Sequence, residues 1–82
     1  MAGAYGDYRS LEEEDRKLFL ETYKGGQALQ PLKVRTQVVA GLNYRFLCQQ
    51  ADDRNRLVEV TIYQPLPGRG APEVTCVEEV RP

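Results

Sequence analysis

The 82-residue sequence has no histidine, no tryptophan and only two cysteines. Without histidine the chain lacks the commonest general base and the commonest metal ligand, and it cannot form a Cys–His or Ser–His catalytic pair by itself. Two thiols are too few for a four-thiolate zinc site. These absences argue against an enzyme and a metal protein, so we expect a binding protein without a cofactor.

Neither sign of charge is in excess, since 11 basic and 12 acidic residues give a net charge of −1. This balance predicts no nucleic-acid partner and no membrane-surface patch, and no apolar run approaches the roughly 20 residues that span a bilayer. The segment from Met1 to Asp7 has neither the basic nor the apolar region of a secretory signal, so we expect a cytoplasmic protein if Met1 is the native start. A chain whose signal had been removed would begin in the same way, and that alternative stays open.

A single helix is predicted from about Leu11 to Lys24. Ser10 and Glu13 have the spacing of a capping box, and Gly25-Gly26 is expected to end the helix. Asp15 occupies a position where an apolar residue would be expected. The apolar stripe of this helix consists of Leu11, Leu18, Phe19, Thr22 and Tyr23.

After the helix the apolar period changes to two, which is typical of strands with one face on a core. The sets expected on the core face are Leu32, Val34 and Thr36; Tyr44, Phe46 and Cys48; Val58, Val60 and Ile62; and Val74, Cys76 and Val80. One helix followed by an antiparallel meander of four to five strands predicts an α+β fold with the helix across one face of the sheet. We expect one domain over residues 1–82, with an N-terminal segment before residue 10 that is mobile at its tip.

Two connections between the predicted strands have an unusual composition. The segment from Gln37 to Gly41 is mostly apolar, whereas hairpin turns are normally built from Asn, Asp and Gly. The segment Pro65-Leu66-Pro67-Gly68 places a leucine between two prolines. Each could be an ordinary strand end or turn, but alternate connections of a meander emerge at the same end of the sheet. Apolar loop tips usually mark a partner-binding surface, so we interpret these loops and the N-terminal segment as one binding edge.

The motifs on these loops resemble a known family. Gln37-Val38-Val39-Ala40-Gly41, followed by Leu42-Asn43-Tyr44, resembles the first inhibitory hairpin of the cystatins, with the pattern Gln-x-Val-x-Gly. Leu66-Pro67-Gly68 resembles the second hairpin of the stefin (type 1) branch, and Met1-Ala2-Gly3-Ala4 resembles its N-terminal trunk. The resemblance covers residues 32–68 well and the remainder in outline, and it implies a cystatin-like fold.

The resemblance implies a reversible, tight-binding inhibitor of papain-like cysteine proteases, such as papain and the cathepsins, that occludes the active-site cleft and is not an enzyme. In that mechanism Gly3 lets the trunk pass the catalytic cysteine, Gln37 braces the first hairpin and Leu66 fills a primed subsite. The protease-binding residues implied are Gly3, Ala4, Gln37, Val38, Val39, Ala40, Gly41, Pro65, Leu66, Pro67 and Gly68. We expect a monomer, with a domain-swapped dimer as a family alternative. A non-inhibitory cystatin-fold binding module or an engineered binding scaffold is the alternative function.

The two cysteines, Cys48 and Cys76, are expected to be reduced and buried. They lie on the first and third of three neighbouring predicted strands, which places their backbones about 10 Å apart. A disulfide needs Cα atoms within about 7 Å of each other. The period-two pattern places both residues on the apolar face, where a free cysteine acts as a small hydrophobic residue.

Overall fold

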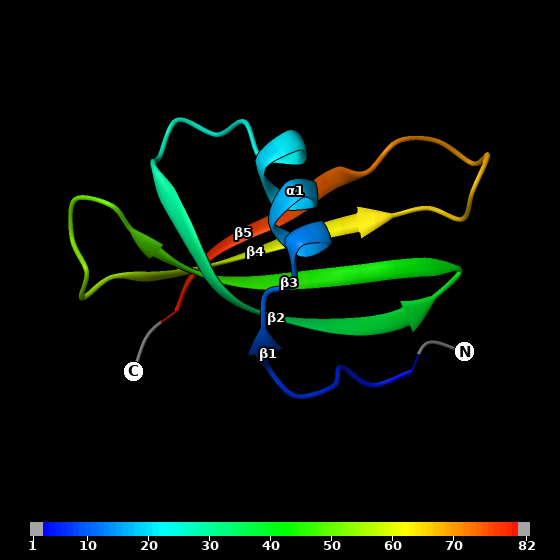
Figure 1. Cartoon of the computed structure of the whole chain (residues 1–82), viewed down its shortest axis with the longest axis horizontal. Coiled ribbons are helices and arrows are strands. Elements are labelled where there is room, and N and C mark those ends of the chain that lie inside the picture. Colours follow the sequence, from blue (N-terminus) through cyan, green and yellow to red (C-terminus); the bar gives the residue numbers. More distant parts are fainter. Residues whose placement is uncertain (1–2, 81–82) are drawn as a thin grey trace.

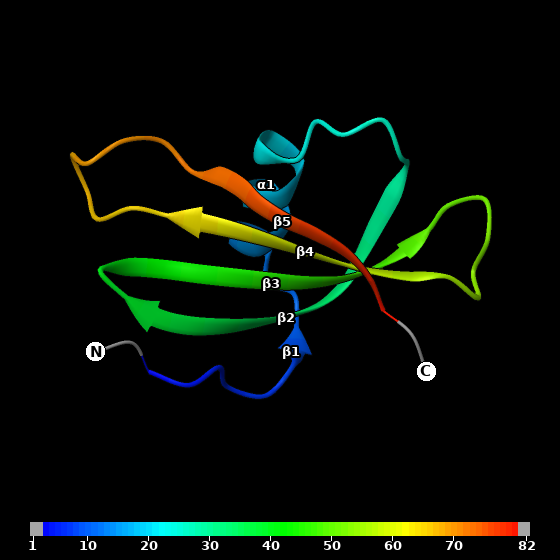
Figure 2. The ribbon, with the colours of Figure 1, turned by 180° about the vertical axis from the view of Figure 1, so that it is seen from behind.

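The computed structural model describes residues 3–80. In chain order the elements are β1 (Arg9–Ser10), α1 (Glu13–Thr22), β2 (Leu29–Val39), β3 (Gly41–Gln50), β4 (Leu57–Gln64) and β5 (Glu73–Val80). The five strands form one antiparallel sheet in the order β1-β2-β3-β4-β5. Helix α1 lies across one face of this sheet (Figure 1), and the view from behind shows the opposite face without a helix in front of it (Figure 2). The predicted α+β fold is confirmed.

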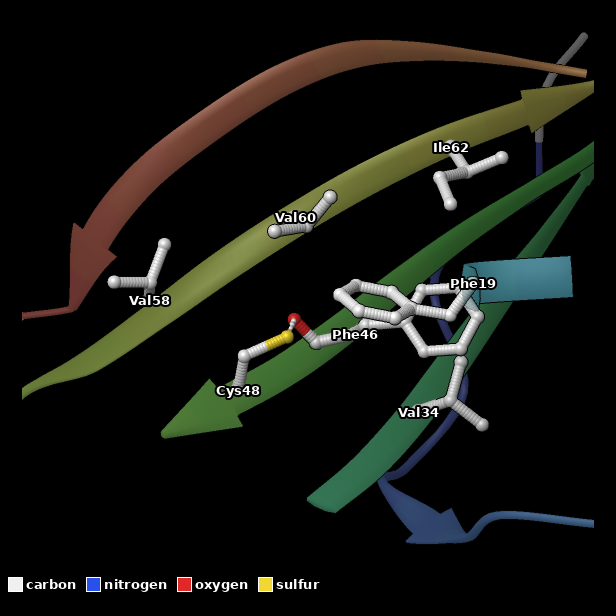
Figure 3. Close-up of a cluster of buried hydrophobic side chains, with 7 residues drawn as sticks. All are labelled: Phe19, Val34, Phe46, Cys48, Val58, Val60 and Ile62. Carbon is white, nitrogen blue, oxygen red and sulfur yellow. Dashed lines mark hydrogen bonds between the residues drawn. The ribbon is translucent and has the colours of Figure 1, made fainter. Parts of the chain in front are cut away.

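The core lies between α1 and the sheet (Figure 3). The buried apolar side chains are Phe19, Val34, Phe46, Cys48, Val58, Val60 and Ile62. The Phe19 ring reaches from α1 to within 5.2 Å of the Phe46 ring, centroid to centroid. Burying one such side chain contributes about 1.5–3 kcal/mol. Phe19 is the one fully buried apolar residue of α1, so it is the main anchor of the helix.

The helix begins and ends differently from the sequence prediction. Its N-cap is Glu12, which forms a capping box with Asp15, and the Glu12 amide donates to Asp15 Oδ2 at 2.9 Å. Ser10 does not cap the helix because its backbone pairs with Lys33 in the sheet. The helix ends at Thr22, before the two glycines, because Tyr23 adopts an extended backbone and stacks its ring on Phe19.

Asp15 is buried although it is charged, and the reason lies in β1. Arg9 donates to both carboxylate oxygens of Asp15, at 2.6 and 3.2 Å, and the Asp15 side chain is 8% exposed. Burial by itself would raise the pKa of Asp15, but the hydrogen bonds from Arg9 and from the Glu12 amide outweigh it and lower that pKa. The apolar position that the sequence pattern left empty is therefore filled by an ion pair that ties α1 to the short strand β1.

Two β-bulges change which residues face the core. In β2 the register shifts between Pro31 and Lys33, so Leu32 is unpaired and 38% exposed while Pro31 is buried in its place. A bulge places two residues of one strand opposite a single residue of the neighbouring strand. The residues before the bulge therefore point to the opposite face of the sheet from the one that simple alternation predicts. The prediction that Leu32 belongs to the core is wrong for this reason.

The second bulge separates the two cysteines. Along β4, Thr61 pairs with Cys76 while Ile62 pairs with Val74, which leaves Thr75 unpaired. Cys76 is therefore turned to the face opposite Cys48 and is only half-buried, so the prediction of two buried thiols holds for Cys48 alone. Neither cysteine forms a disulfide within the described residues.

The two thiols have different surroundings. Burial raises the pKa of Cys48 to about 12. A hydrogen bond from the Cys76 thiol to Glu78, at 3.2 Å, is the main cause that raises the pKa of Cys76. Both groups are therefore protonated at neutral pH, and accessibility is what distinguishes them.

Candidate functional site

Three segments that are distant in sequence lie at the same end of the sheet (Figure 1). They are the β2–β3 hairpin, the β4–β5 loop and the N-terminal segment that begins at Gly3. The Gly3 amide donates to the Val38 carbonyl at 3.1 Å, which places this segment directly beside the hairpin. We call the set Gly3–Ala4, Gln37–Gly41 and Pro65–Gly68 the loop edge. The structure thus brings together the site residues predicted from sequence. Met1 and Ala2 of the predicted trunk lie outside the described residues.

The β2–β3 hairpin is very tight, and its shape depends on Gly41. Val39 pairs with Gly41, so Ala40 alone forms the tip. Gly41 has a φ of 115°, which residues with a side chain rarely adopt. A Cβ at this position would clash with the Gln64 carbonyl oxygen. The hairpin therefore rests against the backbone that leads into the β4–β5 loop. The Tyr63 hydroxyl donates to the Ala40 carbonyl and fastens the same contact.

Gln37 connects the hairpin to the N-terminal segment. It pairs across the ladder with Asn43, whose Nδ2 donates to Gln37 Oε1 at 2.9 Å. Its own Nε2 donates to the Gly3 carbonyl at 2.8 Å. The sequence prediction was that Gln37 braces the first hairpin, without a named partner, and the contact with Asn43 agrees with it. The contact with Gly3 was not foreseen, because no local pattern places a side chain against a residue 34 positions away.

The β4–β5 loop presents Leu66 to solvent. A turn closes it, with the Arg69 amide donating to the Leu66 carbonyl at 3.0 Å, and Gly68 has a φ of 81°. Leu66 is 49% exposed, and Val38 on the hairpin is 66% exposed. Between hairpin and loop runs an open groove of about 460 Å³, lined largely by apolar residues that include Leu42, Pro65 and Pro72. The loop edge therefore offers exposed apolar surface on a backbone braced by hydrogen bonds.

Among the described residues 3–80, no three His, Cys, Asp or Glu side chains gather where they could share a metal ion. Within the same residues, no helix has the length and apolar character needed to cross a membrane.

No family model matches this chain, and no curated protein sequence matches it significantly. Among solved structures, it is similar to a secreted type 1 cystatin from Fasciola hepatica, with 29% sequence identity and a TM-score of 0.76. The similarity covers 95% of this chain and 96% of that one.

The description of that cystatin as secreted contradicts the cytoplasmic location expected from the sequence. The expectation depended on the lack of a signal in the first seven residues, and the lack of a motif does not determine a location. By contrast, the arrangement of the folded chain agrees with the family resemblance throughout. With one helix across an antiparallel meander, a Gln-x-Val-x-Gly hairpin beside a Leu-Pro-Gly loop, and this similarity over nearly the full length, the chain has the cystatin fold and is similar to a type 1 cystatin.

Proposed function

We propose that this protein is a reversible, tight-binding inhibitor of papain-like cysteine proteases and that the loop edge is the surface that enters the protease cleft. The observation that carries the proposal is the fixed alignment of three segments at one end of the sheet, with Val38 and Leu66 exposed on it. The cystatin fold and the similarity to a type 1 cystatin over nearly the full length support the same activity.

The edge is suited to tight binding because it is already ordered. The contacts of Gly41 with Gln64 and of Tyr63 with Ala40 join the two loops, and Gln37 holds the N-terminal segment to the hairpin. Loops that are ordered before association lose less conformational entropy when they bind, so more of the contact energy appears as affinity. The prolines at both sides of Leu66 act in the same direction.

The proposed inhibition requires no covalent step. Val38, at the hairpin, and Leu66, on the second loop, would be buried against the walls of the cleft, which removes apolar surface from water. The Gly3 carbonyl already accepts a hydrogen bond from Gln37, so the segment is held by the inhibitor itself as it passes the catalytic cysteine. The protease would be blocked by occlusion and would remain chemically unchanged.

The proposal is tested by titrating papain with the purified protein and following hydrolysis of a fluorogenic peptide. We expect inhibition at sub-micromolar concentration. Val38→Asp should weaken it at least about tenfold, because a charge would be desolvated at the contact. Leu20→Asp is the matched control, since Leu20 is 62% exposed on α1, away from the loop edge, and it should inhibit like the wild type. A folded wild-type protein that leaves papain fully active at high concentration would refute the proposal and favour the alternative of a non-inhibitory binding module.

A further inference from the structure

The N-terminal segment runs along the edge of the sheet beside β2 (Figure 2), and its tyrosine side chains make aromatic–cation contacts with arginines of the outer face, the face without the helix. The Tyr5 ring contacts two guanidinium groups, with its centroid 4.1 Å from Arg45 Cζ and 5.3 Å from Arg35 Cζ. Arg35 also lies over the Tyr8 ring, at 4.8 Å. The Tyr8 hydroxyl donates to the Glu59 carboxylate, which also pairs with Arg35 at 3.2 Å. We call these five side chains the tyrosine latch.

The outer face needs such a cover. Arg35 and Arg45 are direct cross-strand partners in the β2–β3 ladder, and like charges in that position repel. Within the described residues, the Nε atoms of both guanidinium groups are buried and have no hydrogen-bond partner. The negative faces of the Tyr5 and Tyr8 rings add favourable electrostatic contacts to the ion pair between Arg35 and Glu59. The two arginines and the tyrosine rings that contact them therefore connect the β2–β3 ladder to the N-terminal segment.

The latch is continuous with the loop edge. From Tyr8 toward the N-terminus, the Gly6 amide donates to the Thr36 carbonyl at 3.0 Å, and the Gly3 amide donates to Val38. Tyr5 lies between these two hydrogen bonds in sequence. A segment held by the two backbone bonds and Gln37 alone would be marginal, because termini fray unless side chains secure them.

We infer that the tyrosine latch positions Gly3 and Ala4 beside the β2–β3 hairpin, and that Tyr5 and Arg45 are thereby positioning residues for protease binding. The effect on protease binding rests on the proposed function, whereas the ordering of the N-terminal segment can be measured without any protease. Releasing the latch should leave the core intact and make the segment mobile. The conformational entropy then lost on complex formation should appear mainly as faster dissociation.

Two variants with matched controls separate this role from a purely structural one. Tyr5→Leu removes the ring, whereas Tyr5→Phe keeps it, so the phenylalanine variant should behave as the wild type. Arg45→Met removes the cation and retains an apolar stem, and it serves as the second test if Tyr5→Leu does not fold. Asp7→Asn changes an exposed residue of the same segment and should have no effect.

The first measurement is the backbone ¹⁵N order parameter of Gly6 in the free protein. We expect it to fall from about 0.8 to below about 0.6 in Tyr5→Leu and Arg45→Met, with little change in melting temperature. The second is the dissociation rate of the papain complex, which should rise roughly 3- to 30-fold in the same variants, the range expected for a partly desolvated cation–π contact.

The outcomes distinguish the two proposals. If the wild type does not inhibit papain, the proposed function fails, while an unchanged Gly6 order parameter in Tyr5→Leu would separately overturn the latch. If the wild type inhibits and the freed segment leaves the dissociation rate unchanged, the positioning role is overturned and the proposed function stands. Equal effects of Tyr5→Phe and Tyr5→Leu would show that the ring is not the cause.

Discussion

Replacing Gly41 by alanine tests the contact that joins the two loops. An L-residue at a φ of 115° is strained, at a cost of about 1–3 kcal/mol. In addition, the new Cβ would lie 2.4 Å from the Gln64 carbonyl oxygen and 3.1 Å from Pro65 Cα, both of which are backbone atoms that cannot rotate away. Overpacking of this kind typically costs a further 1–3 kcal/mol or so. We therefore expect Gly41→Ala to lower the free energy of unfolding by about 2–6 kcal/mol.

Gly68→Ala is the matched control because it separates strain from steric conflict. Gly68 also has a positive φ, 81°, but a Cβ there would meet nothing within 4 Å. Gly68→Ala should therefore lower the free energy of unfolding only by the backbone-conformation cost, about 1–2 kcal/mol.

The assay is thermal unfolding followed by circular dichroism, with papain inhibition measured in parallel at 25 °C. Each kcal/mol corresponds to roughly 4–8 °C in a domain of this size, so the two variants should be resolved clearly. The inhibition constant of Gly41→Ala should rise as well, because the hairpin and the β4–β5 loop must move apart. If Gly41→Ala melted no lower than Gly68→Ala, the close approach of the two loops would be refuted.

Three further predictions follow from the described contacts. Because the pKa of Asp15 is lower in the folded than in the unfolded state, its ion pair should stabilise the protein above pH 4 or so and lose that effect as the pH falls through the folded pKa. In urea unfolding, Asp15→Asn should therefore lower the free energy of unfolding by about 1–3 kcal/mol at pH 7 and by much less at pH 3. Ellman's reagent should modify one thiol per native chain, at Cys76, and two after denaturation without reductant, whereas two in the native state would contradict the burial of Cys48. Deleting residues 1–4 removes both hydrogen bonds of Gly3, and it should accelerate dissociation from papain about tenfold while barely changing the melting temperature. A clear drop in the melting temperature would instead show that these residues stabilise the fold itself.

The sequence by itself determined the fold class and the location of the candidate site. The period-two patterns place Val34, Phe46 and Val60 on the core face, and the structure has them buried. The apolar composition of the two connections singled out the loop edge, since apolar loop tips stand out from ordinary turn chemistry. Such signals are local, because side-chain alternation and turn composition are properties of a few consecutive residues.

Only the tertiary structure decided which residues depart from those patterns. Bulges exposed Leu32 and turned Cys76 to the outer face, and a bulge depends on the register between two strands rather than on either strand alone. The contact of Gly41 with Gln64 and the contacts of the Tyr5 ring with two arginines likewise join residues far apart in the chain. Their physical basis is the distance between segments after folding, which no periodicity in one segment encodes.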